Sequence, residues 1–262
     1  MNGLEHSAEG PPLLTLDAPG RATITLNRPR HLNRLHREDL LVLHAHMAQL
    51  ATDTSLRVVV LTGRGRAFCA GFNLQELGQA DATGSDAKLF ERTVDALEAL
   101  PVPTIARLNG GVFGGATDLA LACDFRIGVV GMELRMPAAR LGLHYYPSGL
   151  QRFVTRLGLA TAKRLFLLAQ TVPDQELLRI GYLDALAGAD ELDTTVQAWA
   201  QPLLDGAPLA LRGMKQSLND LARGDAEAHT LRERESLCAQ SADLKEGLAA
   251  FEQRRPARFS GH

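Results

Sequence analysis

Three apolar runs of strand length alternate along the chain with segments that have the pattern of amphipathic helices. The runs cover residues 57–63, 104–108 and 125–130, and the helical patterns cover 38–53 and 86–100. A continuous apolar run bounded by glycine is typical of a strand that is covered on both faces. Such strands alternating with helices of ten or more residues indicate a mostly parallel sheet, and hence an α/β fold.

The two ends of the chain have different patterns. Short strands at 13–17 and 22–26 flank a turn that contains Pro19 and Gly20, which predicts a hairpin. After about residue 170 helical patterns dominate, at 174–180, 194–204, 208–221, 226–239 and 243–254. We therefore expect an α/β unit over 1–192 and a helical region over 193–262.

Composition and charge narrow the possible partners. Hydrophobic residues make up 45% of the chain and charged residues 22%, which is ordinary for a globular protein. The formal net charge of −2 provides no basic field for nucleic acid. We find no leader and no apolar stretch of about 18 residues, so we expect a cytoplasmic protein without a membrane partner. Three cysteines without a CxxC pair and eight scattered histidines predict neither disulfides nor a metal site.

Two glycine-bearing loops are the first candidates for a site. In the first loop Gly71 follows Gly65 by six residues, so the GxGxxG spacing of a dinucleotide site fails. The second loop, 109–115, leads directly into a helical pattern at 116–123. Glycines there leave bare N–H groups at a helix N-terminus, which favours a negative oxygen and is typical of an oxyanion hole. The alternative is a turn in which glycine only relieves backbone strain.

Four motifs, in this order, resemble the enoyl-CoA hydratase/isomerase (crotonase) superfamily. They are TLNRP at 25–29 with Leu32 and Asn33, RAFCAGFNLQEL at 66–77, the segment 109–124, and the segment 243–259. The resemblance runs from about residue 13 to residue 262. It implies a spiral of ββα turns with a C-terminal helical layer, a homotrimer or a dimer of trimers, and an acyl-CoA thioester as substrate. It implies no separate cofactor.

The same resemblance assigns roles to residues of both loops. It implies that the backbone N–H groups of Phe72 and Gly115 polarise the thioester carbonyl and stabilise an enolate. The physical argument agrees, because Gly115 precedes a helix and Gly71 allows the chain to turn. The implied substrate-binding residues are Arg28, Leu32, Ala70, Gly71, Gly114, Ala138, His144 and Tyr145.

The acid/base positions depart from the pattern of the family's hydratases, which use two glutamates. The first position holds Asp118 and the second, after Pro137, holds Ala138. Hydration requires groups that take a proton from water and deliver one to the α-carbon. Shortening one carboxylate by a C–C bond moves it by about 1.5 Å, so an ordinary hydratase is disfavoured. Asp118 is a candidate catalytic residue, and stabilisation of its helix N-terminus is the alternative.

Tyr146 is the second candidate catalytic residue. It falls where isomerase and dehalogenase members of the family carry an aspartate. A phenol can donate a proton or bind an oxyanion, and His144 can titrate near neutral pH. The alternative is that Tyr145, Tyr146 and Pro147 only fill space above the acyl pocket.

The resemblance implies an acyl-CoA transformation through an oxyanion-stabilised enolate. The reaction that we expect is that of a lyase or isomerase on a non-standard acyl group, with Asp118 and Tyr146 moving protons. A low-efficiency enoyl-CoA hydratase that uses Asp118 alone, and an acyl-CoA binding protein without catalysis, are the alternatives.

Overall fold

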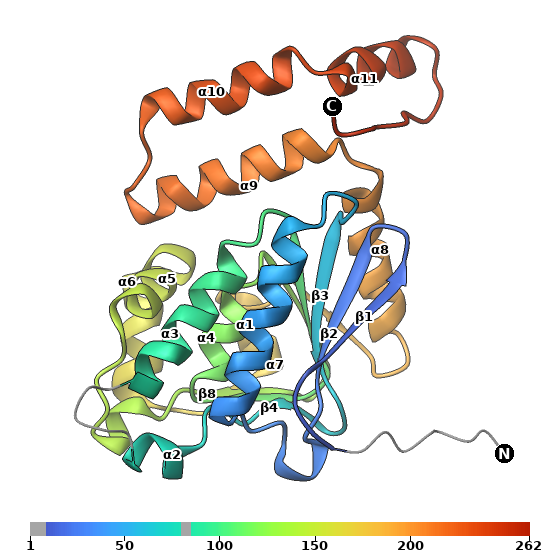
Figure 1. Cartoon of the computed structure of the whole chain (residues 1–262). Helices are drawn as coiled ribbons and strands as arrows, with labels where there is room; N and C mark the ends of the chain where they lie inside the picture. The colour runs from blue at the N-terminus through green and yellow to red at the C-terminus, as the bar shows by residue number, and fades with distance from the viewer. Residues whose placement is uncertain (1–8, 80–84) are drawn as a thin grey trace, which may run out of the picture.

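A six-stranded sheet forms the centre of the protein in the computed structural model, which describes residues 9–79 and 85–262 (Figure 1). Its strands lie in the order β1-β2-β3-β5-β7-β10. They are β1 (Leu13–Ala18), β2 (Arg21–Leu26), β3 (Val58–Gly63), β5 (Thr104–Leu108), β7 (Phe125–Val129) and β10 (Ala185–Ala187). Neighbouring strands are parallel except for the hairpin of β1 and β2. The α/β class, the hairpin and the mostly parallel sheet are confirmed.

Strand β3 is covered on both faces, as its continuous apolar run predicted. Val59 and Leu61 belong to the larger hydrophobic core, whereas Val58 and Val60 belong to a second core on the opposite face. Alternate side chains of a strand point to opposite faces, so a strand between two cores needs apolar residues at every position.

The larger core lies under helices from the first two thirds of the chain. These are α1 (Arg37–Thr52), α3 (Ser85–Glu98), α4 (Ala116–Leu121) and α5 (Pro147–Leu157), with the short helices α2 (Leu74–Gln79) and α6 (Leu159–Lys163) at the edge. Helix α1 buries Leu40, Leu43, Met47 and Leu50, the stripe that the sequence pattern predicted. Helices α1 and α3 lie against each other in front of the sheet (Figure 1).

The structure also contains a second sheet of four short strands, which the sequence analysis did not predict. Its order is β4-β6-β8-β9, with β4 (Ala67–Cys69), β6 (Gly111–Phe113), β8 (Glu133–Arg135) and β9 (Val172–Pro173). The pairs β4–β6 and β6–β8 are parallel and the pair β8–β9 is antiparallel. Strands of two or three residues are too short to show a periodicity, which explains why the sequence pattern did not reveal them.

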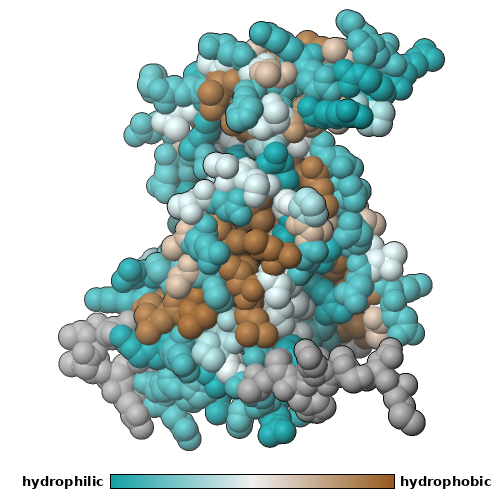
Figure 2. Space-filling view, turned by 45° about the vertical axis from the view of Figure 1, so that its right-hand side comes forward, coloured by the Kyte–Doolittle hydropathy of each residue, from teal (hydrophilic) through white to brown (hydrophobic). Residues whose placement is uncertain are grey.

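The C-terminal third is helical, as expected. Its helices are α7 (Asp174–Arg179), α8 (Leu192–Asp205), α9 (Pro208–Arg223), α10 (Ala228–Ala239) and α11 (Ala242–Glu252). Helix α8 packs on the six-stranded sheet and completes the second core with Leu192, Val196 and Ala200. Helices α9 to α11 form a separate lobe above the sheet, joined to the body through a narrower waist (Figures 1 and 2). Within the described ranges, no helix has the length and hydropathy needed to cross a membrane.

Candidate active site

The candidate active site lies where three strands of the small sheet end. Ala70 to Phe72 follow β4, Gly114 and Gly115 follow β6, and Met136 to Ala138 follow β8. Because β4, β6 and β8 are parallel, their carboxyl ends meet at one edge of the sheet. Loops at the carboxyl ends of parallel strands are the usual position of a ligand site in α/β proteins.

The two glycine loops touch at Gly71. Its φ of +87° is in the region that favours glycine, and a Cβ built there would lie 2.7 Å from Phe113 O and 3.1 Å from Gly115 N. Any larger residue would therefore push the loops apart. Gly71 itself does not line the pocket, but its turn brings the two loops together where Phe72 and Gly115 line it.

The N–H groups of Phe72 and Gly115 make no hydrogen bond to a protein acceptor in the described part of the chain, although their neighbours do. Gly114 N donates to Arg135 O at 2.9 Å, and Asn73 N donates to Leu35 O at 2.8 Å. Phe72 and Gly115 both line the pocket, and Gly115 is the N-cap of α4. Two free donors at a pocket wall, one at a helix N-terminus, are an arrangement that can bind a developing oxyanion.

The TLNRP segment and the residues after it support the first loop from behind. Leu32 O accepts a hydrogen bond from Ala70 N at 2.8 Å, and Asn33 Nδ2 donates to Ala67 O and Phe68 O. Arg28 forms an ion pair with Asp39 at 2.9 Å. Neither Arg28 nor Leu32 lines the pocket, so the structure does not bring these two predicted substrate-binding residues to it.

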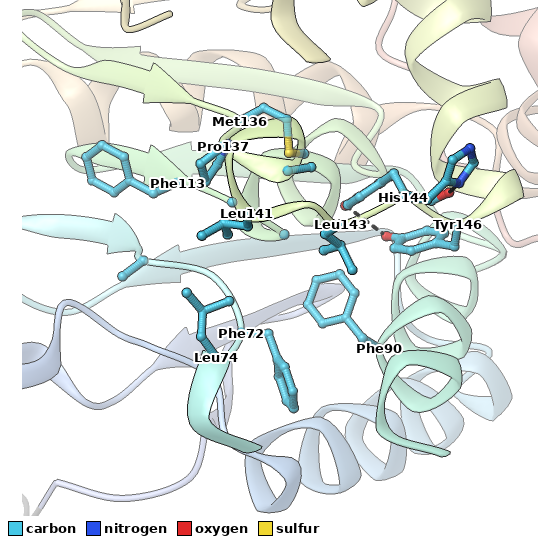
Figure 3. A pocket seen from close by; sticks show the side chains of 15 residues that line it. Phe72, Leu74, Phe90, Phe113, Met136, Pro137, Leu141, Leu143, His144 and Tyr146 are labelled. Atoms are coloured by element: carbon cyan, nitrogen blue, oxygen red, sulfur yellow. Dashed lines mark hydrogen bonds between the residues drawn. The ribbon is translucent and has the colours of Figure 1, made fainter. Parts of the chain in front are cut away.

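The pocket is an apolar cavity of about 210 Å³ in front of the two free N–H groups. Phe72 and Phe90 lie on one side of it and Met136 and Leu141 on the other (Figure 3). The complete lining is Ala70, Phe72, Leu74, Phe90, Phe113, Gly114, Gly115, Met136, Pro137, Ala138, Leu141, Leu143, His144, Tyr145 and Tyr146. Five of the eight predicted substrate-binding residues, namely Ala70, Gly114, Ala138, His144 and Tyr145, are therefore at the pocket.

Asp118 is fully buried and does not line the pocket, but it contacts Tyr146, which does. The Tyr146 hydroxyl donates to Asp118 Oδ2 at 2.5 Å, and Arg152 Nη1 donates to the same oxygen at 2.7 Å. Tyr145 Oη in turn donates to Tyr146 Oη at 3.2 Å (Figure 3). The two predicted catalytic side chains are thus in direct contact, but Tyr146 alone of the two lines the cavity.

Burial and charge determine how this group titrates. Burial raises the pKa of Asp118 above its usual value, and the attraction of Arg152 opposes that rise. Burial, reinforced by the Asp118 carboxylate, raises the pKa of Tyr146 well above its usual value. Tyr146 is therefore a neutral phenol in the resting protein, and Asp118 is a more basic carboxylate than one in water.

Arg152 is a site residue that the sequence analysis missed. It lies on α5 with only 3% of its surface exposed and pairs with Asp95 and Glu98 as well as with Asp118. A signal was present, because Arg152 and Phe153 follow Gly149 by three and four residues, which places all three on one face of α5. Gly149 is required there, since a Cβ would lie 2.9 Å from Asp118 Oδ2.

We expect Arg152→Met to lower the free energy of unfolding by about 3–5 kcal/mol, because it leaves Asp118 buried without its cation, whereas Glu98 keeps Arg156 as a partner. Chemical denaturation followed by circular dichroism measures this change. Arg140→Met is the matched control, since Arg140 is exposed and makes no ion pair in the described structure. Equal stability of the two variants would contradict a structural role for the pair.

Cys69 and Cys123 are buried, and burial raises the pKa of each thiol to about 12. Cys69 Sγ donates to Asn33 O at 3.0 Å, so it supports the loop as a neutral thiol. This agrees with its position behind the pocket wall, among apolar neighbours.

Comparison with known proteins defines the family. The family model described as enoyl-CoA hydratase/isomerase matches residues 19–262. The chain belongs to the enoyl-CoA hydratase/isomerase family. The expected family and the crotonase-like fold are therefore confirmed.

The names of similar proteins describe more than one reaction. The chain is 32% identical to 2,3-dehydroadipyl-CoA hydratase of Escherichia coli over 91% of this chain and 94% of the relative. It is 31% identical to 1,2-epoxyphenylacetyl-CoA isomerase of the same organism over 92% and 95%. The crystal structure of an enoyl-CoA hydratase from Bacillus anthracis superimposes with a TM-score of 0.88, at 28% identity, covering 97% of this chain and 100% of that chain. Membership of this family makes the protein an enzyme that acts on acyl-CoA.

Proposed function

We propose that the protein is a lyase or isomerase that acts on a non-standard acyl-CoA through an oxyanion-stabilised enolate. The observation that carries this proposal is the pairing of the two free N–H groups with one proton-transfer unit, Tyr146 on Asp118, at the same apolar pocket. No Asp or Glu side chain is among the described residues that line the pocket. An enolate reaction needs one such unit, whereas ordinary hydration uses two carboxylates in this family.

The thioester carbonyl oxygen is held by the N–H groups of Phe72 and Gly115. The α-carbon C–H bond breaks, and its electron pair forms the enolate. The proton passes to Tyr146 Oη while the phenolic proton of Tyr146 moves to Asp118 Oδ2. Tyr146 remains neutral throughout and Asp118 becomes a neutral acid. The reverse movement returns the proton to carbon, or protonates an enolate that a lyase reaction has released.

The direct hydrogen bond and the basicity of Asp118 support this relay. The Tyr146 hydroxyl donates to Asp118 Oδ2, so the phenolic proton already points at the group that receives it. Asp118 Oδ1 has no hydrogen-bond partner within the described residues, which leaves the carboxylate less stabilised than a fully bonded one. Arg152 keeps the carboxylate charged before the reaction.

Deuterium exchange tests the proposal without knowledge of the natural acyl group. Butyryl-CoA incubated in D₂O with the protein should gain deuterium at its α-carbon, measured by mass spectrometry, because enolate formation exposes that position to solvent protons. Exchange no faster than in buffer, with butyryl-CoA demonstrably bound, would favour the alternative of an acyl-CoA binding protein without catalysis.

A second test concerns Ala138, which lines the pocket and is 4% exposed. We expect weak hydration of crotonyl-CoA by the unmodified protein, followed by loss of the conjugated thioester absorbance. Ala138→Glu should raise this rate at least about tenfold, because it restores a second carboxylate. Ala139→Glu is the matched control, since Ala139 is exposed and does not line the pocket. Fast hydration by the unmodified protein would instead support the hydratase alternative.

We also propose that the chain assembles as a homotrimer, or as a dimer of trimers, through helices α9 to α11. This lobe exposes many large apolar side chains, with Phe251 at 85% exposure. The others are Met214, Leu218, Leu221, Leu237, Leu244 and Leu248. Apolar surface gathered on one lobe is typical of an interface.

Two truncations separate the role of helices α9 to α11 in assembly from the role of α8 in the second core. A chain that ends at Gly206 keeps the second core and should sediment as a monomer, whereas the full chain should sediment as a trimer or hexamer. A chain that ends at Leu192 also loses α8, which buries Val196 and Ala200, and should precipitate. A full chain that sediments as a monomer would overturn this proposal.

A further inference from the structure

We propose that the acyl group taken by this pocket is apolar, is about six carbons long, carries no terminal carboxylate, and is limited in length by Phe90. This inference rests on the acyl-CoA site of the proposed function and adds the substrate class to it. It follows from the chemistry of the pocket wall, the size of the cavity and the place of one aromatic ring.

Among the described residues of the pocket wall, His144 is the one polar side chain that is not held by another side chain, and it lies at the exposed mouth. The only polar side chains of this wall are His144, Tyr145 and Tyr146, among the described residues. The hydroxyl proton of Tyr145 is donated to Tyr146, and that of Tyr146 to Asp118. His144 is exposed, and its Nδ1 lies 2.8 Å from Tyr145 O. The other described lining side chains are apolar, so a polar chain end among them would lose its hydrogen bonds to water without replacement.

Among the described residues, no Lys or Arg side chain lines this cavity. Arg152 stands behind Tyr146 and is already shared by three carboxylates. The side chains of residues 77–87 are outside the described part of the structure, but their sequence, LGQADATGSDA, contains no Lys, Arg or His. A charge buried without a partner is strongly unfavourable, so the wall selects against an acidic acyl end.

The volume sets an upper limit on the size of the acyl group. A cavity of about 150 Å³ lined by Leu, Ile and Phe accepts benzene. The cavity here is about 210 Å³, which holds a chain or ring of about six carbons together with part of the thioester. A longer chain must either displace a wall or extend past the exposed side chains of Leu74 and Leu141 at the mouth of the pocket.

Phe90 is the wall that stands beside the oxyanion hole. It is 5% exposed, and a Cβ built on Gly115 would lie 2.6 Å from its ring. The ring centroid lies 6.1 Å from that of Phe72 and 6.0 Å from that of Tyr146, so Phe90 closes the gap between these two groups (Figure 3). A chain whose carbonyl is held at Gly115 therefore has this ring next to it.

Calorimetric binding of saturated thioesters tests the exclusion of acidic groups. Hexanoyl-CoA and adipoyl-CoA have six-carbon chains and differ in the terminal group, a methyl in one and a carboxylate in the other. We expect hexanoyl-CoA to bind at least about 100-fold more tightly, because the carboxylate is buried unpaired. Equal dissociation constants would overturn the inference. Because saturated esters cannot be hydrated, tight binding of hexanoyl-CoA without α-carbon exchange would refute only the proposed reaction, and binding of neither ester would refute the acyl-CoA site itself.

Substitution of Phe90 tests the limit on length. Phe90→Ala should increase the affinity for decanoyl-CoA relative to hexanoyl-CoA by about tenfold. Phe125→Ala is the matched control, because Phe125 packs on Trp199 in the second core, away from the pocket. Phe125→Ala also replaces a packed phenylalanine by alanine, but it should leave the ratio of the affinities for decanoyl-CoA and hexanoyl-CoA unchanged. An unchanged ratio in Phe90→Ala, with hexanoyl-CoA still bound, would overturn the role of Phe90.

Discussion

Gly115→Pro should reduce α-carbon exchange by a factor of about 10²–10³ compared with Gly115→Ala. Removal of one preorganised oxyanion donor in other enzymes has an effect of this size. The φ of Gly115 is −57°, which is close to the fixed φ of proline, so the substitution removes the N–H without forcing the backbone to a new φ. The rate measurement is deuterium uptake by butyryl-CoA.

The alanine variant is the necessary control because any Cβ at Gly115 meets the ring of Phe90 at 2.6 Å. Both variants carry this steric contact, but only proline lacks the N–H. Their ratio therefore measures the loss of the N–H together with the ring carbon of proline that replaces its hydrogen. Equal exchange rates for the two would show that the Gly115 N–H does not hold the oxyanion.

The other proposed donor gives a contrasting expectation. Phe72→Ala keeps the backbone N–H and removes a ring from the pocket wall. We expect it to change the preference among acyl groups and to leave enolate formation within about tenfold of the unmodified protein. A loss as large as that in Gly115→Pro would contradict donation by the backbone at this position.

Much of the fold could be predicted because its longer elements carry a periodicity. Strand β5 was predicted with the bounds that it has, and α1 and α9 were predicted to within about two residues. These elements are stabilised by regular burial, which a sequence displays directly. The strands of the small sheet whose ends form the site are three residues long, which is too short to display any pattern.

The candidate site also has features that the sequence displays and features that it does not. A glycine required by positive φ and close backbone approach, such as Gly71, is visible in a sequence because no other residue fits. The contact between Asp118 and Tyr146 is not visible, because 28 residues separate them and the bond depends on how α5 crosses α4. The sequence placed both residues in the site, but it did not indicate that one acts through the other or that Arg152 neutralises the pair.

This arrangement changes which substitution tests the chemistry most directly. Asp118→Asn removes the basic group and should lower α-carbon exchange by about 10² or more. It also takes a carboxylate away from the buried Arg152, so it should lower stability as well. Its effect on rate must therefore be read together with its melting temperature.

Tyr146→Phe is the cleaner probe, and we expect it to lower exchange by about 10²–10⁴ with little loss of binding or stability. The ring keeps its stacking on Tyr145 at 4.3 Å, and only the hydroxyl that joins substrate to Asp118 is removed. If the relay is one unit, the double variant should be hardly slower than either single variant, because each alone already interrupts the transfer. Full activity in Tyr146→Phe with loss in Asp118→Asn would instead make Asp118 the direct base. Activity in both would leave Tyr146 as a space-filling wall and Asp118 as the partner of Arg152 at the start of α4.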